Sequence, residues 1–122
     1  MFQHQNYGGE RELLIYDGAC KSNSPGQKST QSDVVLQAMQ HDDRIRYYYE
    51  PLKIKSGEDH VKLGSKRNWM IGNSTGQIIV HFDDDDYYSP SYLQHMVTTM
   101  IMRKAVMIKL IGISTITLAY RS

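Results

Sequence analysis

The feature that most constrains this chain is a short apolar run that ends in four adjacent carboxylates. Residues 78–82 are bounded by polar residues, a pattern that predicts a buried strand. Asp83, Asp84, Asp85 and Asp86 follow without a spacer. Ligands of open α/β sheets bind outside the C-terminal ends of the strands, and Mg²⁺, Mn²⁺ and Ca²⁺ prefer oxygen ligands. The pattern therefore predicts a cation site that could carry a diphosphate; the alternative is an acidic turn in solvent.

Length and composition limit the chain of 122 residues to one small domain, residues 1–122, with a single core. The formal net charge is +1 with both signs well mixed, so no basic face indicates nucleic acid. Cys20 is the only cysteine, which excludes an internal disulfide and is compatible with a reducing compartment. The sequence shows no signal-peptide pattern, and no uninterrupted apolar run reaches the roughly 20 residues of a membrane helix. We therefore expect a soluble, cytoplasmic protein.

Short apolar runs alternate with segments of helical pattern along the chain. The expected strands cover residues 13–16, 45–49, 78–82, 105–113 and, as a weaker pattern, 116–120. The expected helices are one capped by Ser32 or Asp33 that reaches about Gln40, one capped by Ser65 that runs from Lys66 to about Ser74, and one that starts at Ser89 and Pro90. Strands that alternate with helices predict an α/β fold with a mostly parallel sheet and flanking helices.

Three charged residues lie where such a sheet holds its ligands. Asp17 ends the first expected strand; it could accept hydrogen bonds from a nucleobase or ribose, or it could only begin a turn with Gly18. Lys66 and Arg67 fall in the first turn of their expected helix, where backbone N–H groups also favour anions. The two cations could neutralise a metal-bound diphosphate; ordinary solvated charges are the alternative.

Other residues that could carry chemistry have simpler interpretations. Oxygen-rich sites rarely recruit imidazole, so His81 is interpreted as a structural histidine rather than a metal ligand. The run of tyrosines at 47–49 indicates β-propensity and packing at a sheet edge. The methionines at positions 96, 100, 102 and 107 are predicted to fill the core. Cys20 has no histidine near it in sequence and receives no role.

Taken together, the chain resembles the family-2 glycosyltransferases, inverting enzymes of the GT-A fold. The segments that carry the resemblance are residues 5–7, 12–18, 43–47, 63–68 (Leu-Gly-Ser-Lys-Arg-Asn) and 75–90, which contains the four aspartates. The resemblance implies a Rossmann-like half-domain that binds a nucleotide-sugar, and a single displacement at the anomeric carbon of the sugar.

The resemblance also implies roles for individual residues. The family's Asp-x-Asp element binds the ribose and the divalent metal, Mn²⁺ or Mg²⁺, and it matches Asp83, Asp84 and Asp85. Asp85 is then the direct metal ligand with Asp83 beside it, and Asp84 is the ribose contact. Asp17 matches the acidic residue that recognises the base. Arg67 matches a basic residue beside the nucleotide, next to Lys66.

Two parts of the family pattern are missing from this chain. The first strand of the family would lie before Met1, and the acceptor half with its catalytic carboxylate would lie beyond Ser122. We therefore expect a donor-binding half with an unpaired sheet edge, open to a second copy or a partner chain. The acceptor could be a glycan, a protein or a lipid. The alternative functions are a nucleotidyltransferase, which would normally add a Gly-rich basic loop, and a module that binds a nucleotide or metal without turnover.

Overall fold

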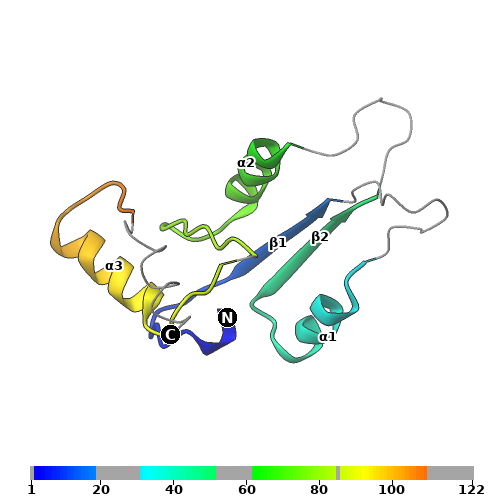
Figure 1. Ribbon diagram of the computed structural model, residues 1–122, viewed down its shortest axis with the longest axis horizontal. Coiled ribbons are helices and arrows are strands. Elements are labelled where there is room, and N and C mark those ends of the chain that lie inside the picture. Colours follow the sequence, from blue (N-terminus) through cyan, green and yellow to red (C-terminus); the bar gives the residue numbers. More distant parts are fainter. Residues whose placement is uncertain (1, 19–30, 52–61, 85, 110–122) are drawn as a thin grey trace, which may run out of the picture. The chain divides into compact units, whose positions relative to one another are not determined.

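The computed structural model describes residues 2–18, 31–51, 62–84 and 86–109 (Figure 1). In chain order its elements are the 3₁₀ helix η1 (Phe2–His4), β1 (Leu13–Gly18), α1 (Asp33–His41), β2 (Ile45–Glu50), α2 (Leu63–Asn73) and α3 (Tyr92–Met102). The chain divides into two compact units. The first is Glu10–His81, and the second joins the residues before Glu10 to those from Phe82 onward.

The first unit contains a parallel pair of strands, as the sequence predicted. β1 and β2 pair in register from Leu13 opposite Ile45 to Gly18 opposite Glu50, and their arrows run side by side in Figure 1. α1 connects them and contacts β2, while α2 contacts β1. Parallel strands need such a crossover because the end of β1 and the start of β2 lie at opposite edges of the sheet. The fold class is therefore α/β.

An aromatic cluster fixes α2 against one face of this sheet. Trp69 of α2 stacks on Tyr48 of β2 with ring centroids 4.5 Å apart, and it meets Tyr16 of β1 edge to face at 5.4 Å. Tyr16 and Tyr48 are opposite each other in the strand register. Such ring pairs contribute about 0.5–1.5 kcal/mol beyond the area they bury. Tyr48 therefore does more than the edge packing predicted for the tyrosine run.

A second contact ties the end of α2 to the start of β1. The Glu12 carboxylate accepts hydrogen bonds from the Thr75 backbone N–H at 2.5 Å and from the Thr75 hydroxyl at 2.9 Å. Arg46 bridges the same carboxylate at 3.2 Å and also donates to the Asn73 carbonyl at 2.8 Å. The hydrogen bond from the Thr75 N–H is the main cause that lowers the pKa of Glu12. One carboxylate thus holds three segments of the first unit.

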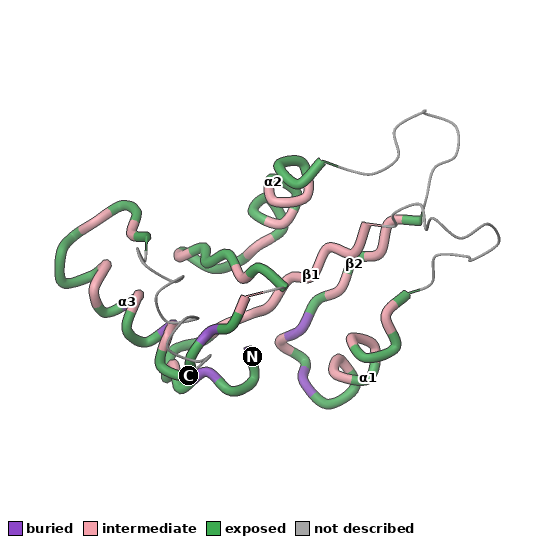
Figure 2. Tube along the Cα trace, viewed as in Figure 1, coloured by how far each residue is buried: buried purple, intermediate pink, exposed green. Residues whose placement is uncertain are grey.

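The second unit is built around the start of α3. Gln5, which is buried, donates through Nε2 to the Ser89 carbonyl at 2.7 Å and accepts the Leu93 N–H through Oε1 at 3.0 Å. Leu93 lies in the first turn of α3, where backbone N–H groups have no partner within the helix. A side chain from the N-terminal segment therefore caps this helix. Among the described residues of the unit, the buried apolar ones are Phe2, Tyr88, Leu93 and Val97. Buried positions along the chain are purple in Figure 2.

Residues 78–82 do not form the strand that the sequence predicted. Ile79 and Val80 are 41% and 36% exposed, and within the described residues β1 pairs only with β2. A strand requires a neighbour to satisfy its backbone N–H and C=O groups. Without one, the apolar run forms no regular element. Residues 105–109 of the expected strand 105–113 are also irregular. Its remaining residues, and the expected strand 116–120, lie outside the described residues.

The helix boundaries differ from the predicted ones in informative ways. α1 is confirmed, although the Ser32 side chain makes no capping hydrogen bond. α2 begins at Leu63 rather than after a Ser65 cap, so Lys66 and Arg67 lie in its second turn. The N-cap of α3 is Ser91, two residues beyond Ser89.

Of the methionines predicted to fill the core, Met102 and Met107 are 78% and 85% exposed, so that prediction was wrong for both. In the described part of the chain, no helix is long and apolar enough to cross a membrane.

Candidate functional site

Asp17 lies at the C-terminal end of β1, where the sequence placed it, and it has a specific partner. The Tyr47 hydroxyl donates to Asp17 Oδ2 at 2.6 Å. The Tyr47 oxygen in turn accepts the backbone N–H of Ser32, directly before α1, at 3.0 Å. Burial, followed by the hydrogen bond to Asp17, raises the pKa of Tyr47 above its ordinary value. Tyr47 therefore keeps its proton at neutral pH and acts as a donor toward the carboxylate.

Lys66 reaches the same end of β1 from α2. Its Nζ lies 5.8 Å from the centroid of the Tyr16 ring, within range of a cation–π interaction. A Cβ placed on Gly18 would lie 2.8 Å from this Nζ, so a larger residue at position 18 would displace the end of the lysine side chain. Arg67, the next residue, is half-buried in α2. A cation thus lies at the strand end, as the ligand hypothesis requires.

Asp17 and Lys66 approach this edge from opposite faces of the sheet. Successive side chains of a strand alternate between faces, so Tyr16 and Asp17 point in opposite directions. Tyr16 lies under α2 beside Lys66, whereas Asp17 points toward Tyr47 and the start of α1. The two residues therefore flank the strand end. A bound group would have to lie across the edge to contact both of them.

Tyr16 forms a third polar contact at this edge. Its hydroxyl donates to the Glu50 carboxylate at the end of β2. Burial is the first cause, and the hydrogen bond to Glu50 the second, that raise the pKa of Tyr16 to about 12. Tyr16 stays neutral over the physiological range. Its hydroxyl therefore adds a polar group at the ends of β1 and β2, while its ring packs under α2.

The acidic segment begins the second unit and turns back on itself. Asp83 and Asp84 are exposed and Asp86 is half-buried, while Asp85 lies outside the described residues. The Asp83 N–H donates to the hydroxyl of Tyr88 at 3.0 Å, and the Asp86 N–H donates to the Asp83 carbonyl at 3.4 Å. Tyr88 is buried and stacks on Phe82 with ring centroids 4.4 Å apart. This aromatic pair anchors the turn, on which the Asp83 and Asp84 side chains are exposed.

The donor chemistry of this turn fits a hard divalent cation, because carboxylate oxygens are the ligands that Mg²⁺ and Mn²⁺ prefer. Within the described residues, no group of three or more His, Cys, Asp or Glu side chains gathers at one point. A complete ligand set would need Asp85 or oxygens from a bound diphosphate. The metal site at Asp83 and Asp85 therefore stays a prediction. So does a cleft shared by Asp17 and Asp84, which belong to different units.

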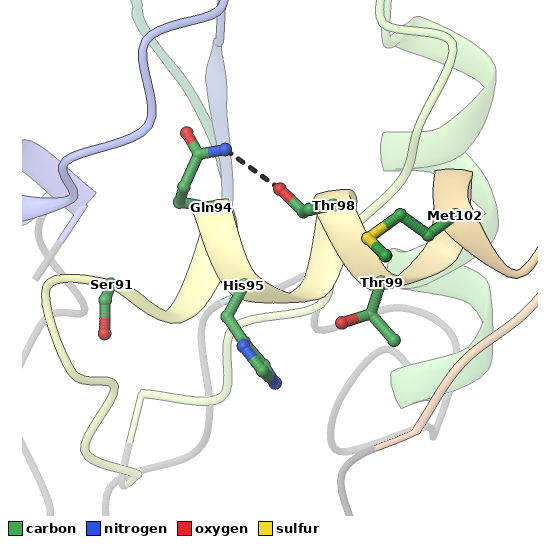
Figure 3. Close-up of a pocket in the computed structure, with 6 residues that line it drawn as sticks. All are labelled: Ser91, Gln94, His95, Thr98, Thr99 and Met102. Atoms are coloured by element: carbon green, nitrogen blue, oxygen red, sulfur yellow. Dashed lines mark hydrogen bonds between the residues drawn. The ribbon is translucent and has the colours of Figure 1, made fainter.

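One face of α3 carries a separate, open hollow of about 470 Å³ (Figure 3). It is lined by Ser91, Gln94, His95, Thr98, Thr99 and Met102. Gln94 Nε2 donates to Thr98 Oγ1 at 3.0 Å across its rim. The hollow offers hydroxyl and amide groups but no carboxylate.

Comparison with protein families decides what kind of chain this is. A family model described as Glycosyl transferase family 2 matches residues 28–120, well over half of the sequence. The chain belongs to glycosyl transferase family 2. No curated protein and no solved structure gave a match. The matched region contains the basic pair and all four aspartates of the acidic segment, whereas Asp17 lies before it.

Sequence reasoning missed two residues of this region, Tyr47 and Glu12. The signal for Tyr47 was present in the alternation of the strands. Ile15 pairs with Tyr47, and Asp17 lies two residues after Ile15 on the same strand. Because side chains alternate between faces along a strand, Asp17 and Tyr47 lie on the same face of the sheet. Glu12 carried no such signal, because its partner Thr75 is 63 residues away.

Proposed function

We propose that this family-2 chain binds a nucleotide-sugar together with Mn²⁺ or Mg²⁺ and serves the inverting transfer of the sugar to an acceptor. Membership of a glycosyltransferase family carries the proposal. The exposed carboxylates of Asp83 and Asp84, and the approach of Lys66 to the end of β1, support it. The cytoplasmic location expected from the sequence belongs to the same proposal, and the acceptor is a glycan, a protein or a lipid.

The roles of the residues follow from charge and position. Asp83 and Asp85 would hold the cation and Asp84 the ribose, while Asp17 would accept hydrogen bonds from the base. Lys66 and Arg67 would offset the negative charge of the diphosphate. The cation itself would stabilise the leaving diphosphate electrostatically. The acceptor hydroxyl would lose its proton to a general base within hydrogen-bond reach.

Calorimetry tests the donor site. We expect Mn²⁺ to bind the wild-type chain, and to bind more tightly when a nucleoside diphosphate is present, because diphosphate oxygens complete the ligand set. Asp85→Ala should weaken Mn²⁺ binding by at least about tenfold, since it removes one charged ligand. Glu10→Ala is the matched control, because it removes an exposed carboxylate remote in sequence from the aspartates. Equal Mn²⁺ affinity in wild type and Asp85→Ala would remove the metal assignment.

A binding module without turnover is the second candidate. The observation in its favour is that residues 87–122 contain no Asp or Glu. Family membership favours sugar transfer over the nucleotidyltransferase alternative. A donor-hydrolysis assay with Mn²⁺ and several nucleotide-sugars separates the two remaining candidates, because a pure binding module releases no free sugar.

A further inference from the structure

We propose that Tyr47 is a positioning residue that orients the Asp17 carboxylate toward the nucleobase of the bound nucleotide. The inference rests on the proposed function and deepens it, because it assigns a residue that determines recognition of the base. It is carried by the 2.6 Å hydrogen bond from the Tyr47 hydroxyl to Asp17 Oδ2 and the 3.0 Å hydrogen bond from the Ser32 N–H to the Tyr47 oxygen.

These two hydrogen bonds connect the carboxylate to rigid parts of the fold. Tyr47 lies within β2, where its backbone pairs with Ile15 of β1. The Ser32 carbonyl accepts the Leu36 N–H in the first turn of α1, which fixes the backbone that presents the Ser32 N–H. Asp17 Oδ2 is thereby held by the strand and the helix start together. An aspartate at a strand end without such a partner would sample several rotamers.

The arrangement leaves the carboxylate able to bind a base. An ionised carboxylate has about four acceptor positions on its two oxygens, and the Tyr47 hydroxyl occupies one of them. The hydrogen bond from Tyr47 goes to Oδ2 of Asp17, so lone pairs on Oδ1 can accept the ring N–H or amino groups that nucleobases present. Because the Ser32 N–H polarises the Tyr47 hydroxyl, the hydroxyl becomes a stronger donor to Asp17. The geometry therefore favours one orientation of the acceptor.

Two probes separate a positioning role from a merely structural one. The first probe is a nucleoside diphosphate: in the presence of Mn²⁺, we would titrate UDP, GDP, ADP and CDP into the whole chain and keep the one that binds most tightly. The second probe is inorganic pyrophosphate, which has no base. Tyr47→Phe should weaken binding of the preferred nucleoside diphosphate about five- to tenfold, because the Asp17 carboxylate that contacts the base loses the hydrogen bond that orients it. Its affinity for pyrophosphate should be unchanged. A structural defect would weaken both probes together.

Tyr48→Phe is the matched control. It deletes the same atom from the next residue of β2, on the opposite face of the sheet, and its hydroxyl makes no hydrogen bond to the described residues. Both probes should bind this variant as they bind wild type. A double-mutant cycle completes the design: in an Asp17→Ala background, Tyr47→Phe should cause no further loss, because the residue acts only through Asp17.

Ser32→Pro keeps the inference testable if Tyr47→Phe folds poorly. Ser32 has φ −72°, which proline adopts. The substitution removes the N–H that Tyr47 accepts and places the proline Cδ where that N–H pointed, so it displaces the Tyr47 hydroxyl from its position. We expect a loss for the nucleoside diphosphate similar to that of Tyr47→Phe and none for pyrophosphate. Loss for both probes, or for neither, in Tyr47→Phe and Ser32→Pro overturns the positioning role while the donor site stands. A wild-type chain that binds no nucleoside diphosphate overturns the proposed function itself.

Discussion

Glu12 makes the stability of the first unit depend on pH. Its pKa is lowered in the folded chain, chiefly because its carboxylate accepts the Thr75 N–H. A carboxyl group with a lowered folded pKa contributes stability that is present above its unfolded pKa and is lost as pH falls through the folded value. The stabilising effect of Glu12 should therefore be complete at neutral pH and should disappear in the acid range, below the ordinary value of 4.5.

Glu12→Gln should lower the free energy of unfolding by about 1 kcal/mol at pH 7, because it removes a charge-assisted hydrogen bond and a partner of Arg46. It should also reduce the loss of stability that wild type shows as the pH falls below the ordinary pKa of a glutamate. Urea unfolding at a series of pH values measures both effects. Glu10→Gln, at an exposed neighbour, is the control. A variant whose pH dependence matched that of wild type would show that the Thr75 contact does not form in solution.

At the scale of elements, α3 depends on a side chain 88 residues away from Leu93. Gln5 is buried and satisfies both the Leu93 N–H and the Ser89 carbonyl. Gln5→Ala should lower stability by about 1–2 kcal/mol, since it leaves a helix-start N–H without its cap. In Gln5→Ala, the amide of Leu93 should exchange with deuterium faster than it does in the wild-type chain, whereas amides in the middle of α3 should exchange at similar rates in both. His4→Ala, at an exposed position beside it, should leave this exchange unchanged; equal rates in wild type and Gln5→Ala would argue against the cap.

The elements that the sequence predicted well are those whose partners are nearby in the chain. β1, α1 and β2 form one consecutive unit, and their apolar patterns placed them within two residues of their observed bounds. The run at 78–82 has the same apolar character but lacks a strand beside it in the described residues. Pattern alone cannot report a missing neighbour. Contacts that span the chain, such as Gln5 with Leu93 and Glu12 with Thr75, were likewise beyond local pattern.

At the scale of the whole molecule, the family followed from the order of the motifs, and the family model confirms it. The α/β class followed from the alternation of strands and helices, and the structure confirms it. The candidate site was predicted only in part. The structure places Asp17 and Lys66 at the end of β1, but their opposite faces and the role of Tyr47 depend on register. Asp85 lies outside the described residues, so its assignment as a metal ligand rests on chemistry and resemblance.

The purified chain should hydrolyse a nucleotide-sugar slowly and transfer little sugar to an added acceptor. Water needs no bound acceptor, whereas transfer needs a base beside the acceptor hydroxyl, and no acidic residue follows Asp86. Product analysis with Mn²⁺ and a panel of acceptors compares the two rates. Robust transfer would overturn the expectation. His95→Ala, His81→Ala and Asp86→Ala would then show which remaining group removes the proton.

The aromatic cluster under α2 also gives the molecule an optical reporter. Trp69 is the single tryptophan, set against nine tyrosines, and its ring lies 4.5 Å from that of Tyr48. Indole emission moves to longer wavelength when water replaces packed neighbours, and light at the red edge of the absorption band excites indole almost alone. Fluorescence therefore follows the undocking of α2 from the sheet without any label. Because Lys66 lies one turn before Trp69 on the same helix, an anion that binds Lys66 should also change the emission of Trp69.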